Sequence, residues 1–442
     1  MKLLLVDAIG DSELHTALPH LGLAYIAAYL RERMTIEIKI VSKEVVETVH
    51  EFKPDVVGIS SVSENYNIAK KYVSVCKSLG ITTIIGGHHI TALPDTLCAD
   101  LGVLGEGEQT AYEVIECIQK YGFALEKLKH IKGVAYFEDG KVKITERREP
   151  IEPMDKLPFP ARDLLPIQKN GWVHLFTSRS CCYKCIFCAS SAFWGKLRFF
   201  SAEYVMKELK FIIETYNPSF VTFSDDLFIA DRQRFEKIVN MICEEGIHKK
   251  VKFILKCRAN LLNDEVMKLL RKMSVIEIGA GIESGCQTTL SYLKDSVTVE
   301  QNAEAIRLTK KYKILFSPTF IIGAPYETKA DALETLEFIK RTKPDQFNFF
   351  QLIPLPSTVI WEYALKRGLV SNDMEDWSKL NLDPNVDKRK RIFMAEKMTI
   401  EEFEEVHALF EKERKKRWRS YAIRKAIRHP KAALLWLKKK VQ

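Results

Sequence analysis

Four cysteines stand close together in the stretch Cys181-Cys182-Tyr183-Lys184-Cys185-Ile186-Phe187-Cys188, directly after an apolar run. Thiolates that converge on one point are soft ligands for iron or zinc. A disulfide scaffold is disfavoured, because adjacent cysteines of that kind are typical of short secreted chains. Three thiolates leave one ligand position open, which favours a catalytic metal centre over a closed structural one.

The spacing allows two triplets with different chemistry. Cys181, Cys185 and Cys188 form C-x3-C-x2-C, the spacing of radical S-adenosylmethionine (SAM) enzymes, and Phe187 is the aromatic residue usual before their last cysteine. Cys182 with the same two partners resembles a ferredoxin run, but the fourth cysteine of a ferredoxin is missing. Structural zinc is a further alternative. We predict that Cys181, Cys185 and Cys188 are the metal ligands and that Cys182 is a bystander.

Length and composition limit the possible classes of protein. With 442 residues, 46% of them hydrophobic, two or three domains with sizeable cores are expected. Ten cysteines without a signal peptide favour a reducing compartment, so we expect a cytoplasmic protein, and no apolar run is long enough for a transmembrane helix. Of the net charge of +9, the last 32 residues contribute +11 and the other 410 contribute −2. A nearly neutral body argues against a nucleic-acid-binding enzyme.

Residues 1–125 alternate apolar runs with helical patterns, which predicts a doubly wound, Rossmann-like α/β domain. The expected strands are Lys2–Asp7, Thr35–Val41, Asp55–Ser60, Thr82–Ile85 and Leu101–Leu104, and the expected helices are Leu21–Arg33 and Ile68–Ser78. Such folds bind ligands at the carboxyl ends of their strands, where glycine and hydroxyl side chains suit a large ligand, although ordinary turns use the same residues. The candidate residues there are Ser60, Ser61, Ser63, Gly86, Gly87, His88, Gly105, Glu106 and Gly107.

Residues 126–170 are expected to connect two domains. Asp139-Gly140 between two apolar runs predicts a β-hairpin, and the prolines between Glu149 and Pro166 prevent long regular structure. Residues 171–360 then contain six strand–helix units, which predict a partial parallel (β/α)6 barrel. Parallel-barrel enzymes work at the carboxyl ends of their strands, so the polar residues expected there are candidate binding residues, with helix capping as the alternative. These are Asp226, Arg258, Glu283 and Ser284.

Residues 361–442 are expected to be mostly helical. Thr399 and Glu402 suggest a capping box at the start of a charged helix. The final segment, Arg417 to Lys440, mixes basic residues with Trp418, Trp436 and other apolar side chains. It could contact an anionic membrane surface or an acidic protein, or it could be a solvated basic helix that packs on the body.

Together these motifs resemble the cobalamin-binding (class B) radical SAM enzymes. The resemblance rests on Leu21-Gly22-Leu23, Gly58-Ile59-Ser60, Gly86-Gly87-His88, Gly105-Glu106-Gly107-Glu108, the cysteine triplet, Trp194-Gly195, Gly281-Ile282-Glu283-Ser284-Gly285 and Gly323-Ala324-Pro325. It implies a [4Fe–4S] cluster on the three cysteines, SAM contacted by Phe187, Asp226, Arg258, Glu283 and Ser284, and cobalamin held by the nine candidate residues of the first domain. In two respects the chain departs from its relatives. The Asp-x-His-x-x-Gly motif of other cobalamin proteins is absent, and Ser180 and Cys182 stand where Gly and Pro are usual.

The resemblance implies a C-methyltransferase that uses two SAM molecules. One would methylate cobalamin, and the other would yield a 5′-deoxyadenosyl radical that abstracts hydrogen from an unactivated carbon of the substrate. The alternatives are a cyclase or ring-rearranging oxidoreductase with the same cofactors, and a non-catalytic cobalamin or iron–sulfur sensor. The expected partners are a flavodoxin- or ferredoxin-like electron donor and a peptide, protein or small-molecule substrate, with no nucleic acid.

Overall fold

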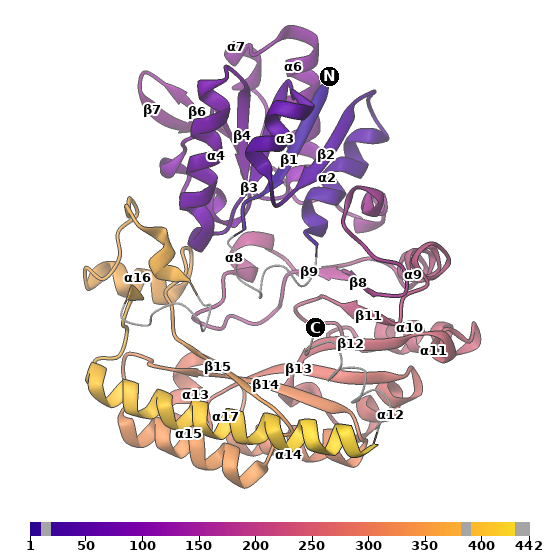
Figure 1. Ribbon diagram of the computed structural model, residues 1–442, viewed down its shortest axis with the longest axis vertical. Coiled ribbons are helices and arrows are strands. Elements are labelled where there is room, and N and C mark those ends of the chain that lie inside the picture. The colour runs from indigo at the N-terminus through magenta and orange to yellow at the C-terminus, as the bar shows by residue number, and fades with distance from the viewer. Residues whose placement is uncertain (10–18, 382–389, 429–442) are drawn as a thin grey trace. The chain divides into compact units, whose positions relative to one another are not determined.

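The computed structural model describes residues 1–9, 19–381 and 390–428, with side chains described up to residue 422. The chain folds into two compact units, whose elements are labelled in Figure 1. Unit 1 comprises Met1–Asp226 and Ile353–Ile392. Unit 2 comprises Leu227–Leu352 and the chain from Phe393 onward.

Unit 1 begins with a seven-stranded sheet of order β2-β1-β3-β4-β5-β6-β7, in which β1 to β5 are parallel. The residues Leu3 to Val6 of β1 are each at most 4% exposed, as expected for a parallel strand that is covered on both faces. The predicted alternation is confirmed, and the helices α3, α5, α6 and α7 add to the two that the pattern predicted. The elements are β1 (Lys2–Asp7), α2 (Leu21–Arg31), β2 (Glu37–Val41), α3 (Val45–Phe52), β3 (Val56–Ser60), α4 (Tyr66–Ser78), β4 (Thr82–Gly86), α5 (His88–Ala92), β5 (Leu101–Val103), α6 (Gly107–Tyr121) and α7 (Leu125–Leu128).

The predicted hairpin is present as β6 (Val134–Glu138) and β7 (Lys141–Ile144). It turns through Asp139 and Gly140, both of which have positive φ angles. β6 pairs antiparallel with β5, so the hairpin extends the first sheet to its edge. The sequence analysis assigned this hairpin to the connector, because its pairing partner cannot be read from the local pattern. The division of the chain at residues 125, 170 and 360 stays a prediction.

The rest of unit 1 contains the cysteine segment, a two-stranded sheet of β9 and β10, and the strands β8 and β11. β8 and β11 pair in parallel, and β9 and β10 pair antiparallel. Arg162 anchors β8, because its guanidinium donates to the carbonyl of His174 at 3.0 Å and pairs with the fully buried Glu208. The elements are β8 (Trp172–Leu175), β9 (Ser178–Arg179), α8 (Ser190–Trp194), β10 (Arg198–Phe199), α9 (Ala202–Tyr216), β11 (Phe220–Phe223) and α16 (Val359–Lys366).

Unit 2 contains four further parallel strands in the order β15-β14-β13-β12. With β8 and β11 of unit 1, the chain has the six predicted β/α units of the second domain. The elements are α10 (Arg232–Glu244), α11 (Ile247–Lys250), β12 (Lys252–Arg258), α12 (Asp264–Lys272), β13 (Val275–Glu283), α13 (Gln287–Leu293), α14 (Val299–Lys311), β14 (Leu315–Ile322), α15 (Lys329–Thr342) and β15 (Asn348–Gln351).

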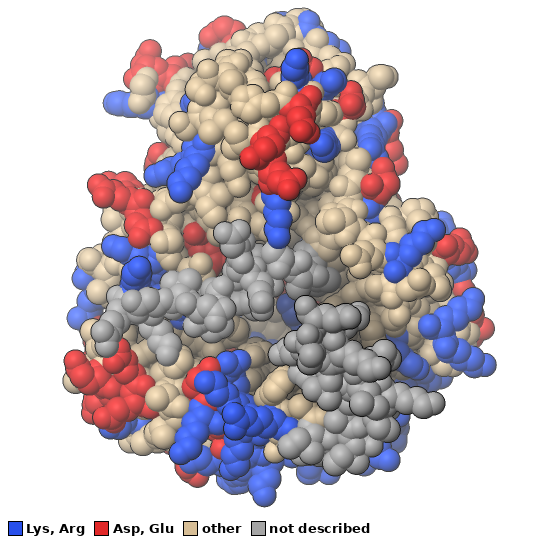
Figure 2. Space-filling view, in the orientation of Figure 1, with Lys and Arg blue, Asp and Glu red and all other residues tan. Residues whose placement is uncertain are grey.

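The last described helix, α17 (Ile400–Arg428), packs on α15 of unit 2. The predicted capping box is confirmed, because Glu402 N–H donates to Thr399 Oγ1 at 3.2 Å and Thr399 N–H donates to the Glu402 carboxylate at 3.0 Å. Acidic side chains gather over its first turns and basic ones further along, an order that complements the helix dipole (Figure 2). Residues 429–442 of the predicted basic tail lie outside the described residues. Among those described, no helix is both long and apolar enough to cross a membrane.

Candidate functional site

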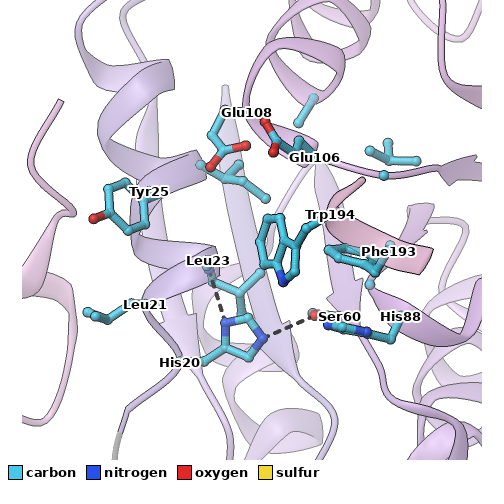
Figure 3. A pocket seen from close by; sticks show the side chains of 18 of the residues that line it. His20, Leu21, Leu23, Tyr25, Ser60, His88, Glu106, Glu108, Phe193 and Trp194 are labelled. Carbon is cyan, nitrogen blue, oxygen red and sulfur yellow. Dashed lines mark hydrogen bonds between the residues drawn. The ribbon is translucent and has the colours of Figure 1, made fainter. Parts of the chain in front are cut away.

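A cavity of about 600 Å³ lies in unit 1 at the carboxyl ends of the parallel strands (Figure 3). Part of its lining is apolar and belongs to the core beside the sheet, as Leu5, Ile84 and Ile115 show. Another part comes from the cysteine segment, including Arg179 and Ser190. The volume falls within the range of roughly 300–1,000 Å³ that is typical of ligand pockets. One cavity therefore joins the predicted cobalamin loops to the cysteine segment.

Most of the predicted cobalamin-binding residues line this cavity. They are Ser60, Gly86, Gly87, His88, Gly105, Glu106 and Gly107. Ser61 does not line it, and its hydroxyl donates to the carbonyl of Val62 at 2.8 Å. Ser63 lines a neighbouring pocket of about 170 Å³, and its hydroxyl lies 3.0 Å from His89 Nδ1. The fold itself thus uses the hydroxyls of Ser61 and Ser63, and cobalamin binding by all nine residues stays a prediction.

At two positions of these loops, neighbouring atoms lie so close to the backbone that only glycine fits. Gly87 has φ of +98°, and a Cβ there would lie 2.7 Å from the carbonyl oxygen of Ser61. A Cβ on Gly107 would lie 2.8 Å from Ile26 Cδ1. Gly107 begins α6, so its missing side chain lets this helix pack against α2 beside the cavity. These loops offer bare backbone to a ligand, which fits a large cofactor such as cobalamin.

Glu106 and Glu108 form buried ion pairs with arginines of the cysteine segment. Arg179 Nη1 lies 3.3 Å from Glu106 Oε2, and its other terminal nitrogen pairs with Glu108. Arg198 pairs with Glu106 as well. All four side chains are at most 8% exposed. The loop after β5 is therefore tied to the strands that flank the cysteines, a role that the sequence analysis did not assign to these residues.

Arg179 is also held by two aromatic rings. Its guanidinium carbon lies 5.4 Å from the ring centre of Tyr25 and 4.9 Å from that of Trp194. Cation–π contacts of this kind are strongest where water is excluded. Because Arg179 precedes Ser180 and Cys181 directly, this clamp orients the start of the cysteine loop. Because Arg179 and Glu106 are far apart in the sequence, no local sequence pattern could have predicted their ion pair.

Two neighbouring histidines at the amino end of α5 have different environments. His88 lines the cavity and stacks on Phe193, with ring centres 3.9 Å apart. Burial lowers its pKa to about 4, and His20 nearby adds to this, so the ring is neutral at physiological pH. His89 is fully buried, stacks on Tyr66 and uses both ring nitrogens in hydrogen bonds. His89 is thus part of the core, whereas His88 faces the cavity.

The cysteine loop starts at an unusual backbone angle. Ser180 has φ of +80°, a region that favours glycine, and its hydroxyl donates to the carbonyl of Gly195 at 2.6 Å. Glycine, which the resemblance implies at this position, would adopt this angle without strain. In the present chain the partly buried hydrogen bond of Ser180 offsets the strain.

The three predicted ligand thiols are close to one another. The pKa of the Cys188 thiol is raised to about 11, chiefly by desolvation of its sulfur although the residue as a whole is exposed, and Asp226, Cys185 and Cys181 contribute to the same rise. The three sulfur atoms are nevertheless not all within 4.8 Å of one another. In the described part of the chain, the one set of three His, Cys, Asp or Glu side chains whose ligand atoms lie within that distance is Cys286, Asp331 and Glu334. A single zinc ion would need that proximity, whereas a cluster lets each thiolate bind a separate iron. The donor set thus fits an iron–sulfur cluster better than structural zinc.

The two aspartates after β11 have separate tasks. Asp225 is completely buried, and its carboxylate accepts hydrogen bonds from Thr177 N–H at 2.8 Å and from the Ser178 hydroxyl at 2.6 Å. It fixes the strand that leads into the cysteine loop. Asp226, a predicted SAM contact, lines the cavity and accepts a hydrogen bond from Ser190. Phe187 lies in the loop itself and is half-buried.

The other predicted SAM contacts belong to unit 2. Glu283 ends β13 with φ of +62°, lies 3.3 Å from Lys294 Nζ and has its pKa raised by burial. A buried carboxylate on strained backbone is a common mark of a functional position. Arg258 ends β12 and is 4% exposed. The hydroxyl of Ser284 is already used, because it bonds Thr335 and accepts from Cys286 N–H. SAM binding by these residues stays a prediction.

Because Glu327, which follows β14 in unit 2, is a buried carboxyl group, we expect the free energy of unfolding to depend on pH. Burial raises its pKa to about 7 from 4.5, although the N–H groups of Gly323 and Ala324 bind its carboxylate. Because the folded state binds this proton more tightly, the stabilisation is complete below about pH 4.5 and is lost as the pH rises through 7. We expect the free energy of unfolding to fall by on the order of 3 kcal/mol over that range.

Urea unfolding of wild type and Glu327→Gln between these pH values measures the effect. Glutamine keeps an acceptor for the two N–H groups but does not titrate, so its stability profile should be flatter. Parallel profiles for the two proteins would contradict the assignment.

Comparison with known proteins agrees with this geometry. Residues 11–115 match the family model "B12 binding domain", and residues 175–339 match the "Radical SAM superfamily". An uncharacterized methyltransferase from Pyrococcus horikoshii is 31% identical over 408 residues, with 87% of each chain covered. An anaerobic magnesium-protoporphyrin IX monomethyl ester cyclase from Rubrivivax gelatinosus is 26% identical over 388 residues, with 80% of this chain and 67% of the cyclase covered.

Among solved structures, the fold is similar to that of the radical SAM methyltransferase TsrM from Kitasatospora setae. The TM-score is 0.69 for TsrM with cobalamin and a [4Fe–4S] cluster bound, at 14% identity, with 83% of this chain and 75% of TsrM covered. With tryptophan substrate and a SAM analogue bound, the TM-score is 0.72, and the coverage is 90% and 86%.

The chain therefore belongs to the cobalamin-binding radical SAM enzymes, and within them to the methyltransferase family. Its cofactors are cobalamin, a [4Fe–4S] cluster and SAM. The predicted fold class, a Rossmann-like cobalamin domain followed by a partial radical SAM barrel and helices, is confirmed.

Proposed function

We propose that this protein transfers a methyl group to an unactivated carbon of its substrate. The observation that carries the proposal is the cavity of about 600 Å³ in unit 1, which is lined both by the loops of the cobalamin domain and by residues next to the cluster cysteines. When bound, the cofactors supply a methyl group on cobalamin and a 5′-deoxyadenosyl radical made from SAM. A shared cavity favours reactions that need both in one place.

The protein side chains hold the cysteine segment at the cavity and exclude water from it. The apolar lining around Leu5 and Ile115 removes water from one part of the cavity, and the aromatic side chains of Phe193 and Trp194 cover another part. Buried ion pairs between Arg179, Arg198 and the acidic loop hold the cysteine segment at the cavity. Protection from water matters because a primary carbon radical abstracts hydrogen from many groups.

As part of the proposal, the methyl acceptor is a peptide or protein side chain or a small molecule. A flavodoxin- or ferredoxin-like protein supplies the electron that the cluster needs. We also propose a reducing, cytoplasmic location, where thiolates stay available as cluster ligands.

SAM with a trideuterated methyl group tests the proposal. Anaerobically reconstituted protein, a reductant and candidate acceptors are incubated with labelled SAM, and products are analysed by mass spectrometry. We expect 5′-deoxyadenosine, S-adenosylhomocysteine and an acceptor that carries the deuterated methyl group. Omission of cobalamin is the matched control and should remove the labelled product. A modified acceptor without deuterium would exclude methyl transfer.

The relation to the cyclase supports a second candidate. A cyclase or ring-rearranging oxidoreductase would use the same cavity and would form 5′-deoxyadenosine, but its product would contain no methyl group from SAM. The sensor alternative predicts neither product. The labelled-SAM experiment therefore separates all three.

A further inference from the structure

The strands β12 to β15 of unit 2 present alternate side chains to two faces of their sheet. Helices cover one face: Phe320 of β14 packs on Phe338 of α15, and α12 and α14 contact β13 and β14 (Figure 1). Ile278, Ala280 and Ile282 of β13 point to this face and are at most 5% exposed. The opposite face is the inner face of the partial barrel.

The inner face differs from the interior of an ordinary parallel barrel. Such interiors are filled mainly by bulky branched side chains. Here two neighbouring levels of the face are polar or bare, and their residues are partly or fully exposed except for Arg258. By strand register, the first level is Lys256, Gly279 and Ser317, and the second is Arg258, Gly281, Thr319 and Asn348. This composition suits the binding of a polar ligand better than the packing of a core.

Lys256 carries a positive charge at the first level. Its side chain is exposed, and its ammonium forms no hydrogen bond or ion pair within the described part of the chain. Gly279 lies beside it, and a Cβ there would lie 3.5 Å from Lys256 Cγ. The missing side chain leaves the flank of the lysine open. An anionic group can therefore reach the ammonium next to bare backbone.

Glu277 offers an acceptor on the same face. Gln346 Nε2 donates to Ser317 Oγ at 2.7 Å, so the hydroxyl proton of Ser317 is directed to Glu277 Oε1 at 2.6 Å. This chain of hydrogen bonds fixes the carboxylate and leaves Oε2 without a hydrogen bond among the described residues. Lys256 and Glu277 do not pair with each other, although their charges are opposite. Both charges thus remain available to a ligand.

We propose that the inner face of unit 2 recognises an anionic group of the substrate, a carboxylate or a phosphate, through Lys256. Glu277 accepts a hydrogen bond from a donor on the same molecule. Lys256 is a specificity-determining residue in this assignment. It precedes Arg258, a predicted SAM contact, by two residues or about 7 Å of strand. The inference rests on the proposed function, because it names the class of substrate for the same enzyme.

Fractionation of the substrate pool tests the charge of the substrate. An extract of the organism that produces the protein is divided by an anion-exchange resin into retained and unretained fractions. Each is incubated with reconstituted enzyme, reductant and trideuteromethyl SAM, and new products are found by mass spectrometry. We expect a product from the retained fraction alone. Its loss after phosphatase treatment of that fraction identifies a phosphate, and its loss after carbodiimide coupling to methylamine identifies a carboxylate. A product from the unretained fraction alone would overturn the inference.

Variants of Lys256 test the residue with the retained fraction as substrate. In Lys256→Met we expect the apparent KM for this fraction to rise about 10- to 100-fold, as for loss of a hydrogen bond to a charged group, with kcat and the KM for SAM unchanged. Lys256→Arg should restore most of the affinity. Lys252→Met is the matched control, because Lys252 is exposed on the same face of β12 but lies about 13 Å along the strand.

A rise in the KM for SAM instead of the substrate, or an equal effect of Lys252→Met, would contradict the role of Lys256. The isotope label separates this inference from the proposed function. A product without deuterium would contradict methyl transfer, whereas the fraction from which it forms would still decide the charge of the substrate.

Discussion

In Cys181→Ala, iron and sulfide should fall to background after anaerobic reconstitution, whereas Cys182→Ala should retain the amounts found in wild type. Cys181 interacts electrostatically with Cys182, Asp226 and Cys185, and Cys188 interacts with Asp226, Cys185 and Cys181. Cys182 and Cys188 are exposed, whereas Cys181 and Cys185 are half-buried, so the expected difference rests on the spacing of the triplet rather than on exposure. Loss of one of the three cluster ligands leaves two of the four irons without a protein thiolate. We therefore expect nearly all of the cluster's absorbance in the visible range to be lost.

The two variants control for each other, because they remove the same atoms from adjacent positions of one loop. Circular dichroism should be unchanged in both, since neither side chain belongs to the buried core. Iron loss in Cys182→Ala with iron retained in Cys181→Ala would assign the ferredoxin-like triplet instead. Cys185→Ala should behave as Cys181→Ala under either assignment.

The parts of the fold that could be predicted depend on short-range patterns. β1 is buried on both faces, so Leu3-Leu4-Leu5-Val6 forms a continuous apolar run that the sequence displays directly. Asp139-Gly140 supplies the positive φ angles of a hairpin turn and marks it locally. The cysteine loop is likewise contained within a few residues. Each of these features needs no knowledge of a distant partner.

The remaining features depend on partners far away in the chain. Glu106 and Arg198 are 92 residues apart, so the loop motif suggested a ligand contact where the structure shows an ion pair. Ser61 and Ser63 look equivalent to Ser60 in sequence, but strand geometry and His89 direct their hydroxyls into the protein. His20 escaped notice because histidine is not a common helix cap, and only its distance to Leu23 identifies that role.

The stability of unit 1 should be especially sensitive to loss of the charge of Glu106, in the loop after β5. In Glu106→Leu, Arg198 would lose its carboxylate partner while it remains 3% exposed, whereas Arg179 would retain Glu108. Removal of one member of a buried ion pair typically costs about 3–5 kcal/mol, because the remaining charge is desolvated and uncompensated. We expect a loss of this size in the free energy of unfolding, measured in urea.

A double-mutant cycle separates the charge effect from lost packing. Arg198→Met alone should also destabilise, because Glu106 is then left in a buried site with only Arg179 beside it. The double variant Glu106→Leu with Arg198→Met should lose less than the two single losses combined, since hydrophobic replacement of a whole buried pair is often close to neutral.

Lys132→Met is the matched control, because its partner Glu146 is 72% exposed and surface pairs contribute only about 0–1 kcal/mol. Losses that add without coupling, or a Glu106 effect no larger than that of Lys132, would contradict the assignment. A strong coupling would mean that the loop after β5 and the strand after the cysteines are stable only together. The carboxylate of Glu106, alongside the Arg179–Glu108 pair, would then hold the loop after β5 against the cysteine segment before any cofactor binds.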